Sequence, residues 1–437
     1  MKKIALINHG CAKNLVDSEL MLGILAKDGY KITLDEKNCD IVIVNTCSFI
    51  HDAEEESVHS ILEMVNDGKK VIITGCLPQK HKKELVKAVP EAVAFLGTSD
   101  FKMISEVVAK LVGNEDETGY FDVSENPVYS YPEEVERQQI TMGASSYLKI
   151  ADGCNFECGY CIIPKLRGKY VSRTMENIVK EANSLVKKGV NEIVLIAQDT
   201  TSYGIDLYGK PSLASLLKEL NKIEGLSWIR LMYTYPSLID DELLKTINDL
   251  DKVVKYIDIP LQHFSKNVLK RMKRPAFDYM EMIKNMRNLV PNIAIRTTFI
   301  VGYPGETKEE FDELYDFVNE ARFDKLGVFE YSKEKETYAY SLPDQITSRV
   351  KKQRKNKLMK LQQKISKSIN ESLVGLQIDC IVESLGEDGS IVARSYKDAP
   401  EVDGLVFIET EEVLSPGDIV SVKITAANEY DLFGKIN

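Results

Sequence analysis

The sequence predicts an α/β protein in three parts: an open parallel sheet, a partial (β/α)6 barrel and a small antiparallel β-barrel. Short β-branched runs alternate with helical patterns in the first part, and six further βα units follow in the second. Short strands separated by Gly, Pro and acidic turns fill the third. The chain has 437 residues, and domains average about 150 residues. We therefore expect domains at 1–120, 141–370 and 371–437, with a linker over 121–140.

In the amino-terminal domain, each of three strand-like runs is followed by a cysteine. The runs cover 3–7, 40–44 and 71–74, and the cysteines are Cys11, Cys47 and Cys76. In an open α/β sheet, ligands collect beyond the carboxyl ends of the strands. We therefore expect the three cysteines to converge on one spot, although buried structural cysteines would give the same spacing.

The segment 121–140 has two prolines and several acidic residues, which is typical of a linker. Strand-like runs then cover 146–150, 192–197, 228–232, 256–259, 294–301 and 326–331, and helical patterns such as 176–187 and 308–319 fill most gaps. This alternation favours an incomplete barrel, but a doubly wound sheet has the same alternation. A second set of cysteines, Cys154, Cys158 and Cys161, falls in the loop after the first run, at the end where barrel active sites form.

A basic amphipathic stretch from Arg349 to Ser368 predicts a helix that leads into the carboxy-terminal domain. Strand-like runs there cover 377–383, 389–394, 405–408 and 418–426. The last 67 residues hold 14 Asp and Glu but only 4 Lys and Arg, so they carry nearly all of the chain's net charge of -11. Such a surface repels a phosphate backbone and attracts a basic protein, although solubility alone explains it equally well.

The cysteine content and the hydropathy of the chain bear on its setting. No apolar run approaches the roughly 18 residues of a membrane span, and no cleavable signal follows Met1. We therefore expect a cytoplasmic protein without a membrane partner, in which eight cysteines serve as metal ligands rather than disulfides. Cys39 and Cys380 belong to neither triad, and we interpret both as structural.

The triad at Cys154, Cys158 and Cys161 has no fourth cysteine nearby. A structural zinc site and a ferredoxin cluster both need four protein ligands. Three thiolates on a four-iron cluster would leave one iron open, where a small molecule can bind and react. A zinc site completed by a distant ligand is the alternative.

The sequence resembles the radical S-adenosylmethionine (SAM) methylthiotransferases of the RimO type over essentially its whole length. The run from Cys154 to Cys161 is similar to the radical-SAM signature Cys-x-x-x-Cys-x-aromatic-Cys. Further segments that resemble the RimO type are 10–19, 45–50, 75–79, 197–204, 258–263, 296–302 and 398–404. The related tRNA-modifying MiaB enzymes usually carry an Ile-Arg pair just after the second cysteine, where this chain has Phe49-Ile50. Asn8-His9 departs from the Ser-Leu common in the family.

The resemblance implies two [4Fe-4S] clusters, with SAM as a further cofactor. Cys11, Cys47 and Cys76 would hold the first cluster, and Cys154, Cys158 and Cys161 would hold the radical-SAM cluster, where a reduced open iron splits SAM to a 5'-deoxyadenosyl radical. Enzymes of this type place a methylthio group on the β-carbon of one aspartate in the twelfth small-subunit ribosomal protein. They consume two SAM and need a reductant and a sulfur donor. The carboxy-terminal domain would be a TRAM barrel.

Two other functions stay open. The first is tRNA adenosine methylthiolation, since TRAM barrels often bind RNA, but the acidic tail leads us to expect that direct nucleic-acid binding does not dominate. The second is a non-catalytic iron-sulfur protein that senses redox state. Such a sensor has no need of a second open-iron cluster.

The candidate SAM-binding residues are Tyr160, Arg173, Gly302 and Glu306. Tyr160 lies just before the last cysteine, where it could face the adenine, and 302–306 resembles the adenine-side motif of radical-SAM barrels. A helix-capping turn explains that segment equally well. Arg167 and Arg173 could each pair with a carboxylate, or could be ordinary surface arginines. His263 could line the cavity but is more typical of a structural histidine. We assign no catalytic residue beyond the cluster cysteines.

Overall fold

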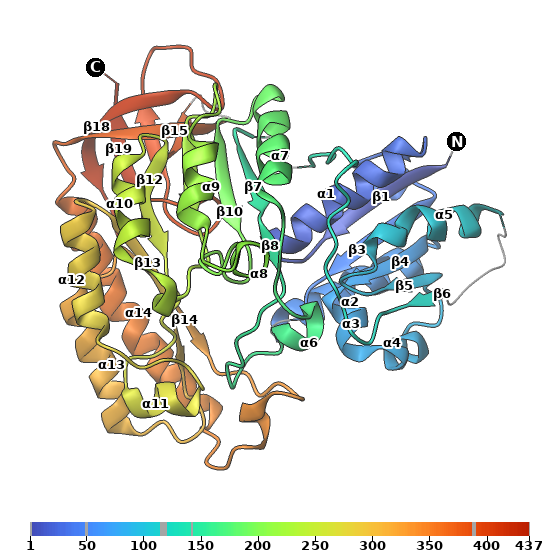
Figure 1. The fold of residues 1–437 in the computed structure, drawn as a ribbon, viewed down its shortest axis with the longest axis horizontal. Coiled ribbons are helices and arrows are strands. Elements are labelled where there is room, and N and C mark those ends of the chain that lie inside the picture. Colours follow the sequence, from blue (N-terminus) through green and yellow to red (C-terminus); the bar gives the residue numbers. More distant parts are fainter. Residues whose placement is uncertain (1, 49–50, 114–119, 141–142, 387–389, 437) are drawn as a thin grey trace. The chain divides into compact units, whose positions relative to one another are not determined.

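The computed structural model describes residues 2–48, 51–113, 120–140, 143–386 and 390–436, and Figure 1 shows their fold. The chain divides into two compact units. The first unit comprises Met1–Thr141, Ala151–Phe156 and Ile162–Arg173, and the second comprises Met142–Ile150, Glu157–Cys161 and Thr174–Asn437. Phe49-Ile50, on which part of the distinction from MiaB depends, lie outside the described residues.

One parallel sheet forms the framework of the first unit. Its strands are β1 (Lys3–Asn8), β2 (Lys31–Ile32), β3 (Ile41–Thr46), β4 (Lys70–Gly75), β5 (Ala94–Leu96) and β6 (Tyr120–Asp122), in the order β2-β1-β3-β4-β5-β6. The three predicted strands are confirmed as β1, β3 and β4. The chain leaves β1 for β2 on one side and returns to β3 on the other. This reversal makes a topological switch point between β1 and β3, where a crevice opens at the carboxyl ends.

Helices connect the strands of the first sheet (Figure 1). They are α1 (Ala12–Lys27), α2 (His51–Asn66), α3 (Cys76–His81), α4 (Lys83–Ala88) and α5 (Ile104–Gly113). All six residues of β3 are buried, as expected of a strand covered on both faces. The predicted linker begins inside the sheet, since Phe121 and Asp122 lie in β6, and its Arg137 forms a buried ion pair with Glu19 of α1 at 3.0 Å.

The second unit contains a six-stranded parallel sheet. Its strands are β7 (Ser145–Lys149), β10 (Glu192–Ile196), β11 (Trp228–Leu231), β12 (Val253–Asp258), β13 (Ala294–Val301) and β14 (Lys325–Glu330), and they neighbour one another in chain order. All six coincide with predicted strands. A doubly wound sheet would reverse its order at a switch point, so that alternative is wrong for this unit, and the partial barrel is confirmed.

Helices precede and follow the strands of this partial barrel (Figure 1). They are α7 (Met175–Lys187), α8 (Ile205–Tyr208), α9 (Leu213–Leu220), α10 (Asp241–Asp249), α11 (Lys266–Arg271), α12 (Tyr279–Leu289), α13 (Lys308–Ala321) and α14 (Ser348–Glu371). α14 confirms the helix predicted from the basic amphipathic stretch. In the first unit, β8 (Ala151–Asp152) pairs with β9 (Val171–Ser172), and α6 (Ile163–Arg167) lies between them in the chain. No helix in the described part of the chain is long and apolar enough to span a membrane.

The carboxy-terminal strands close into a small barrel. They are β15 (Gln377–Leu385), β16 (Ile391–Ser395), β17 (Val406–Glu409), β18 (Ile419–Ala427) and β19 (Leu432–Lys435), in the order β15-β16-β17-β19-β18. The sequence pattern missed β19, which pairs in parallel with β17, while the other pairs are antiparallel as predicted. That one parallel pair closes the barrel and removes its free edge.

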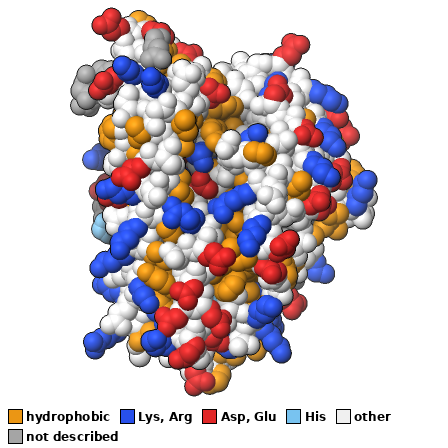
Figure 2. Space-filling model, turned by 90° about the vertical axis from the view of Figure 1, so that its left-hand side faces the viewer, with side chains coloured by type: hydrophobic (Ala, Val, Ile, Leu, Met, Phe, Trp, Pro, Cys, Tyr) orange, Lys and Arg blue, Asp and Glu red, His pale blue; other side chains and the backbone are white. Residues whose placement is uncertain are grey.

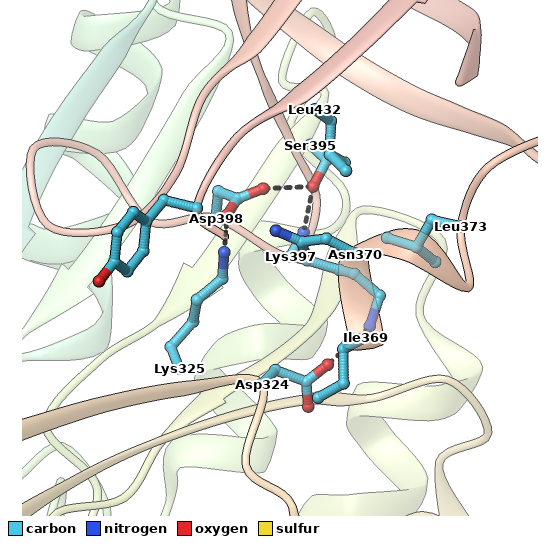
Figure 3. A pocket seen from close by; sticks show the side chains of 10 residues that line it. Asp324, Lys325, Ile369, Asn370, Leu373, Ser395, Lys397, Asp398 and Leu432 are labelled. Carbon is cyan, nitrogen blue, oxygen red and sulfur yellow. Dashed lines mark hydrogen bonds and ion pairs between the residues drawn. The ribbon is translucent and has the colours of Figure 1, made fainter. Parts of the chain in front are cut away.

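Buried ion pairs join this small barrel to the partial barrel. Glu192 at the start of β10 is fully buried and pairs with Arg230 at 2.7 Å and with Arg394 of β16. Two ion pairs lie side by side (Figure 3), Lys325 with Asp398 at 2.5 Å and Asp324 with Lys397 at 2.9 Å. In the first pair the partial barrel supplies the cation, and in the second it supplies the anion. Part of the acidic charge of the tail is therefore neutralised inside the second unit. On the face shown in Figure 2, acidic and basic side chains are interspersed.

Candidate functional site

The first cysteine triad lies at the carboxyl ends of three neighbouring strands. Cys11 caps the start of α1 after β1, Cys47 follows β3, and Cys76 opens α3 after β4. Burial, reinforced by the negative charges that Cys11 and Cys47 would carry, raises the pKa of the Cys76 thiol to about 11. The structure thus brings three residues that are 36 and 29 positions apart to the carboxyl ends of three adjacent strands, β1, β3 and β4.

Asn14 connects two of these cysteines. Its side chain is buried on the first turn of α1, where Nδ2 donates to the carbonyl of Thr46 at 2.9 Å and to Cys76 Sγ at 3.9 Å. The Cys11 thiol donates to Asn14 Oδ1 at 3.8 Å. The sequence analysis missed this residue. Its signal was its position, because a side chain three residues after Cys11 lies on the same face of the helix.

Arg167 supplies a buried positive charge to this region. Its Nη1 pairs with Asp17 at 3.0 Å and with Asp152 at 2.7 Å, and Nη2 donates to Asn14 Oδ1. Although desolvation by the surrounding protein opposes ionisation, the charges of Lys13 and Arg167 keep the pKa of Cys11 below its ordinary value. A surface position is wrong for Arg167, which is only 5% exposed.

The second cysteine triad lies on the loop between β8 and α6. Cys154 belongs to the first unit, where its N–H donates to the carbonyl of Gly168 at 3.1 Å. Cys158 and Cys161 belong to the second unit, where a turn joins Cys161 N–H to Cys158 O at 3.0 Å. None of the eight cysteines, all of which are described, forms a disulfide.

The backbone around Cys158 is tightly fixed by Gly159. Its N–H donates to Met272 O at 2.8 Å, and its carbonyl accepts from Ala339 N–H at 2.7 Å. A Cβ at this position would lie 2.7 Å from the hydroxyl of Tyr303, a distance that real Cβ atoms do not tolerate. Only glycine allows this approach, so the loop between the two cysteines is held in one conformation.

Arg274 lies beside Cys158. It follows α11, and its Nη1 donates to Cys158 Sγ at 3.7 Å and to the Tyr160 hydroxyl at 3.5 Å. Nη2 donates to Pro260 O at 2.8 Å, and the guanidinium carbon lies 4.5 Å from the ring centre of Tyr235. Sequence reasoning missed this arginine, because more than a hundred residues separate it from the cysteine and no local pattern relates them.

The structure places the candidate SAM-binding residues in different settings. Tyr160 lies against Arg274, and burial raises its pKa well above the ordinary value. Gly302 has a φ of +74°, and its N–H donates to Glu306 at 2.6 Å. Glu306 also pairs with Arg354 at 2.6 Å. The other role considered for 302–306, a turn that leads into a helix, accounts for these contacts, since Glu306 closes the turn before α13.

Two further sequence candidates also occupy structural positions. Arg173 is buried in the first unit, where its guanidinium lies 3.4 Å from the ring centre of Tyr131, so a surface position is wrong for it as well. His263 is fully buried, and its Nδ1 accepts from Ser265 N–H at 3.1 Å. Burial and the charges of Arg271 and Arg354 lower its pKa to about 3. A neutral, structural histidine is the consequence.

The donor set of the first triad is chemically suited to an iron-sulfur cluster, because its three side chains are thiols, the ligands that such clusters use. Cys11 and Cys76 both contact the buried amide of Asn14, at 3.8 and 3.9 Å. Among the described residues, no three Cys, His, Asp or Glu side chains are grouped as the ligands of one metal ion would be.

Three family models match successive parts of the chain. The model described as Uncharacterized protein family UPF0004 matches residues 3–97, the Radical SAM superfamily model matches 148–318, and the TRAM domain model matches 374–436. The first covers all three strands that precede Cys11, Cys47 and Cys76, and the second includes the loop with the second triad.

Relatives match over the full length of the chain. A protein named ribosomal protein uS12 methylthiotransferase RimO from a Thermoanaerobacter species is 48% identical, with 100% of both chains covered. Proteins of the same name from Caldanaerobacter subterraneus and Clostridioides difficile are 47% and 44% identical, with at least 99% of each chain covered. The chain belongs to the RimO family. RimO proteins are radical-SAM methylthiotransferases, and membership implies a [4Fe-4S] cluster and SAM.

Solved structures of radical-SAM enzymes share the fold of this RimO-family chain. The methyltransferase TsrM from Kitasatospora setae superimposes with a TM-score of 0.56 at 16% identity, with 75% of this chain and 73% of that chain covered. The cobalamin-dependent enzyme OxsB gives a TM-score of 0.54 at 16% identity, with 82% and 56% covered. At this identity the likeness shows the fold alone.

Proposed function

We propose that this RimO-family chain transfers a methylthio group to the β-carbon of one aspartate of ribosomal protein uS12. The observation that carries the proposal is the position of Cys11, Cys47 and Cys76 at the carboxyl ends of three adjacent strands of one sheet, in a chain that has a second three-cysteine loop after the first strand of a radical-SAM barrel. The full-length similarity to proteins named uS12 methylthiotransferase supports the same substrate.

The six cysteines would hold two [4Fe-4S] clusters: Cys11, Cys47 and Cys76 the first, and Cys154, Cys158 and Cys161 the second. When bound, the clusters, two SAM and the sulfur donor would supply a methylthio group and a carbon-centred radical that can abstract hydrogen from an unactivated C–H bond. Such a bond offers no acidic proton, so a general base could not replace the radical. The reaction also requires a reductant and a sulfur donor as partners.

The protein's own contribution is to position these groups. Asn14 fixes Cys11 and Cys76 through its amide, and Arg167 holds Asn14 in turn. Gly159 anchors the backbone between Cys158 and Cys161 to the segments around Met272 and Ala339. These contacts preorganise thiols on secondary-structure ends, so less ordering is needed when a cluster binds. The candidates for contacts with SAM are still Tyr160, Arg173, Gly302 and Glu306. Among them, Tyr160 makes the fewest contacts that hold the fold together.

The substrate can be tested directly. The reconstituted and reduced protein would be incubated with SAM and sulfide, and with either uS12 or tRNA. We expect the mass of uS12 to rise by one methylthio group on a single aspartate, and the mass of the tRNA to stay unchanged. In the cell, we expect this modification to form in the cytoplasm. A gain on tRNA alone would refute the protein substrate, and a failure to form 5'-deoxyadenosine with any substrate would support the non-catalytic alternative.

A further inference from the structure

Arg274 is a buried cation that has no carboxylate partner among the described residues. Its side chain is 7% exposed, and its hydrogen bonds go to a thiol, a phenol and a backbone carbonyl: Cys158, Tyr160 and Pro260. Its Nε is buried without a hydrogen-bond partner in the described structure. The protein has therefore removed this guanidinium from water without supplying a negative charge of its own.

This arrangement is costly unless an anion binds there. Burying an unpaired charge is strongly unfavourable, and arginine cannot avoid that penalty by losing its proton. A neighbouring arginine has the usual carboxylate partner: Arg271, three residues earlier, pairs with Glu310 at 2.6 Å. The contrast between the two arginines indicates that Arg274 awaits an anion that is not an Asp or Glu side chain of the described structure.

The position of the guanidinium is fixed on two sides. Nη2 is held by Pro260 O at 2.8 Å, and the ring of Tyr235 lies against the guanidinium plane at 4.5 Å. Such a stacked, hydrogen-bonded arginine cannot turn its charge toward solvent. Nη1 donates to Cys158 Sγ at 3.7 Å and to the Tyr160 hydroxyl at 3.5 Å. The charge is thus positioned on a sulfur that the proposed function assigns to the radical-SAM cluster.

We propose that Arg274 is the counter-cation of the radical-SAM cluster and makes that cluster easier to reduce. The inference rests on the proposed function. Reduction adds one electron to the cluster, and a fixed positive charge beside a ligand sulfur stabilises the more negative state. Arg274 is a positioning residue, because it acts on the cluster through Cys158 and its hydrogen bond to that sulfur.

The test is a redox titration of the full-length, anaerobically reconstituted protein without SAM, followed by electron paramagnetic resonance of the reduced clusters. The radical-SAM signal is the one that changes when SAM is then added. For Arg274→Gln we expect the ratio of reduced to oxidised cluster at a fixed potential to fall at least tenfold, which equals a downward shift of about 59 mV for one electron. Arg274→Lys retains the charge and should stay within about threefold of wild type.

Lys273→Gln is the matched control. Lys273 precedes Arg274, carries the same charge and is exposed, with its Nζ 4.2 Å from the ring centre of Tyr338. Its substitution should leave the ratio unchanged. Equal shifts in K273Q and R274Q would overturn the inference, because a general change in net charge would then explain both.

Two further outcomes would also overturn it. If R274Q keeps the wild-type ratio but binds SAM more than tenfold more weakly, the anion is the SAM carboxylate and not the cluster. If R274Q does not retain its iron, the charge-retaining variant R274K is used instead. A tenfold fall in its ratio of reduced to oxidised cluster contradicts the inference, and a wild-type ratio supports it. Wild-type protein that forms no 5'-deoxyadenosine would refute the proposed function, whereas normal cleavage with an unshifted R274Q ratio would refute only this inference.

Discussion

The two cysteine sites each have a buried arginine, but the charge around these arginines differs. Arg167 of the first unit pairs with two carboxylates, Asp17 and Asp152, so the protein itself compensates its charge. Arg274 of the second unit has no described carboxylate partner and contacts Cys158 directly. Two sites with the same number of thiols therefore differ in how their buried arginine is neutralised. If the six cysteines hold clusters as proposed, the uncompensated arginine would favour reduction of the second cluster.

Removing a ligand from each site should separate the two roles most strongly. Cys158→Ala should abolish formation of 5'-deoxyadenosine while the first cluster remains countable, with about four of about eight irons left per chain. Cys11→Ala should lose a similar amount of iron but keep cleavage of SAM, because the open iron at the second triad is intact. Iron analysis and chromatography of the cleavage products measure both. Cleavage that survives in C158A would contradict the assignment of the second triad.

Removing Arg167 tests the compensated charge. Arg167→Met should destabilise the first unit by about 3–5 kcal/mol, because Asp17 and Asp152 stay buried without their cation. Chemical denaturation of the iron-free protein measures this. Arg137→Met is the comparison, since it removes the buried partner of Glu19, which lies on α1 as Asp17 does. Both should unfold earlier, but only R167M should also lower the iron bound by the first triad. Equal iron loss in both variants would show that stability alone is responsible.

Acid titration tests charge compensation at Glu192, which belongs to neither cysteine triad. Although burial opposes it, Arg394 and Arg230 lower the pKa of Glu192 to about 2, whereas an unfolded glutamate titrates near pH 4.3. A depressed native pKa stabilises the fold above the unfolded value, and this contribution is lost as the pH falls through about 2. We expect about 3 kcal/mol of unfolding free energy to disappear between pH 4.5 and 2. Glu192→Gln, compared by thermal unfolding across that range, should lose less of its stability on acidification.

The smallest effect should come from the amide that connects Cys11 and Cys76. Asn14→Ala removes the bonds to Thr46 O and to both sulfurs and leaves Arg167 without one acceptor, which should cost about 1–3 kcal/mol. Loss of iron from the first triad to a chelator should become faster, with the second cluster unaffected. Asn14→Asp retains an acceptor for Arg167 but loses the donor to Cys76, so its rate of iron loss should lie between those of the wild type and Asn14→Ala. Identical chelation rates in all three proteins would exclude a role for the amide.

The acidic tail shows what composition alone leaves open. Its charge suggested a surface that attracts a basic partner; most of its described carboxylates are exposed, but Asp398 and Asp403 face Lys325 at 2.5 Å and Arg296 at 3.4 Å within the second unit. A charge count cannot tell which carboxylates face solvent. For the same reason, Arg167 and Arg173 could not be distinguished from surface arginines until their burial was known.

The sequence by itself determined the order of the three matched domains, all six strands of the partial barrel, three of the six strands of the first sheet, and the spacing of the cysteines. These features are local, because strand periodicity and the spacing 154–158–161 are written in consecutive residues. Only the tertiary structure decided the order β2-β1-β3 that brings Cys11, Cys47 and Cys76 together, the position of β19, and the pairing of Arg167 in contrast to Arg274. Those depend on contacts between residues far apart in the chain, which no local pattern encodes. The number of thiols in each cysteine triad could be counted in the sequence, but the charges beside each triad depend on the fold.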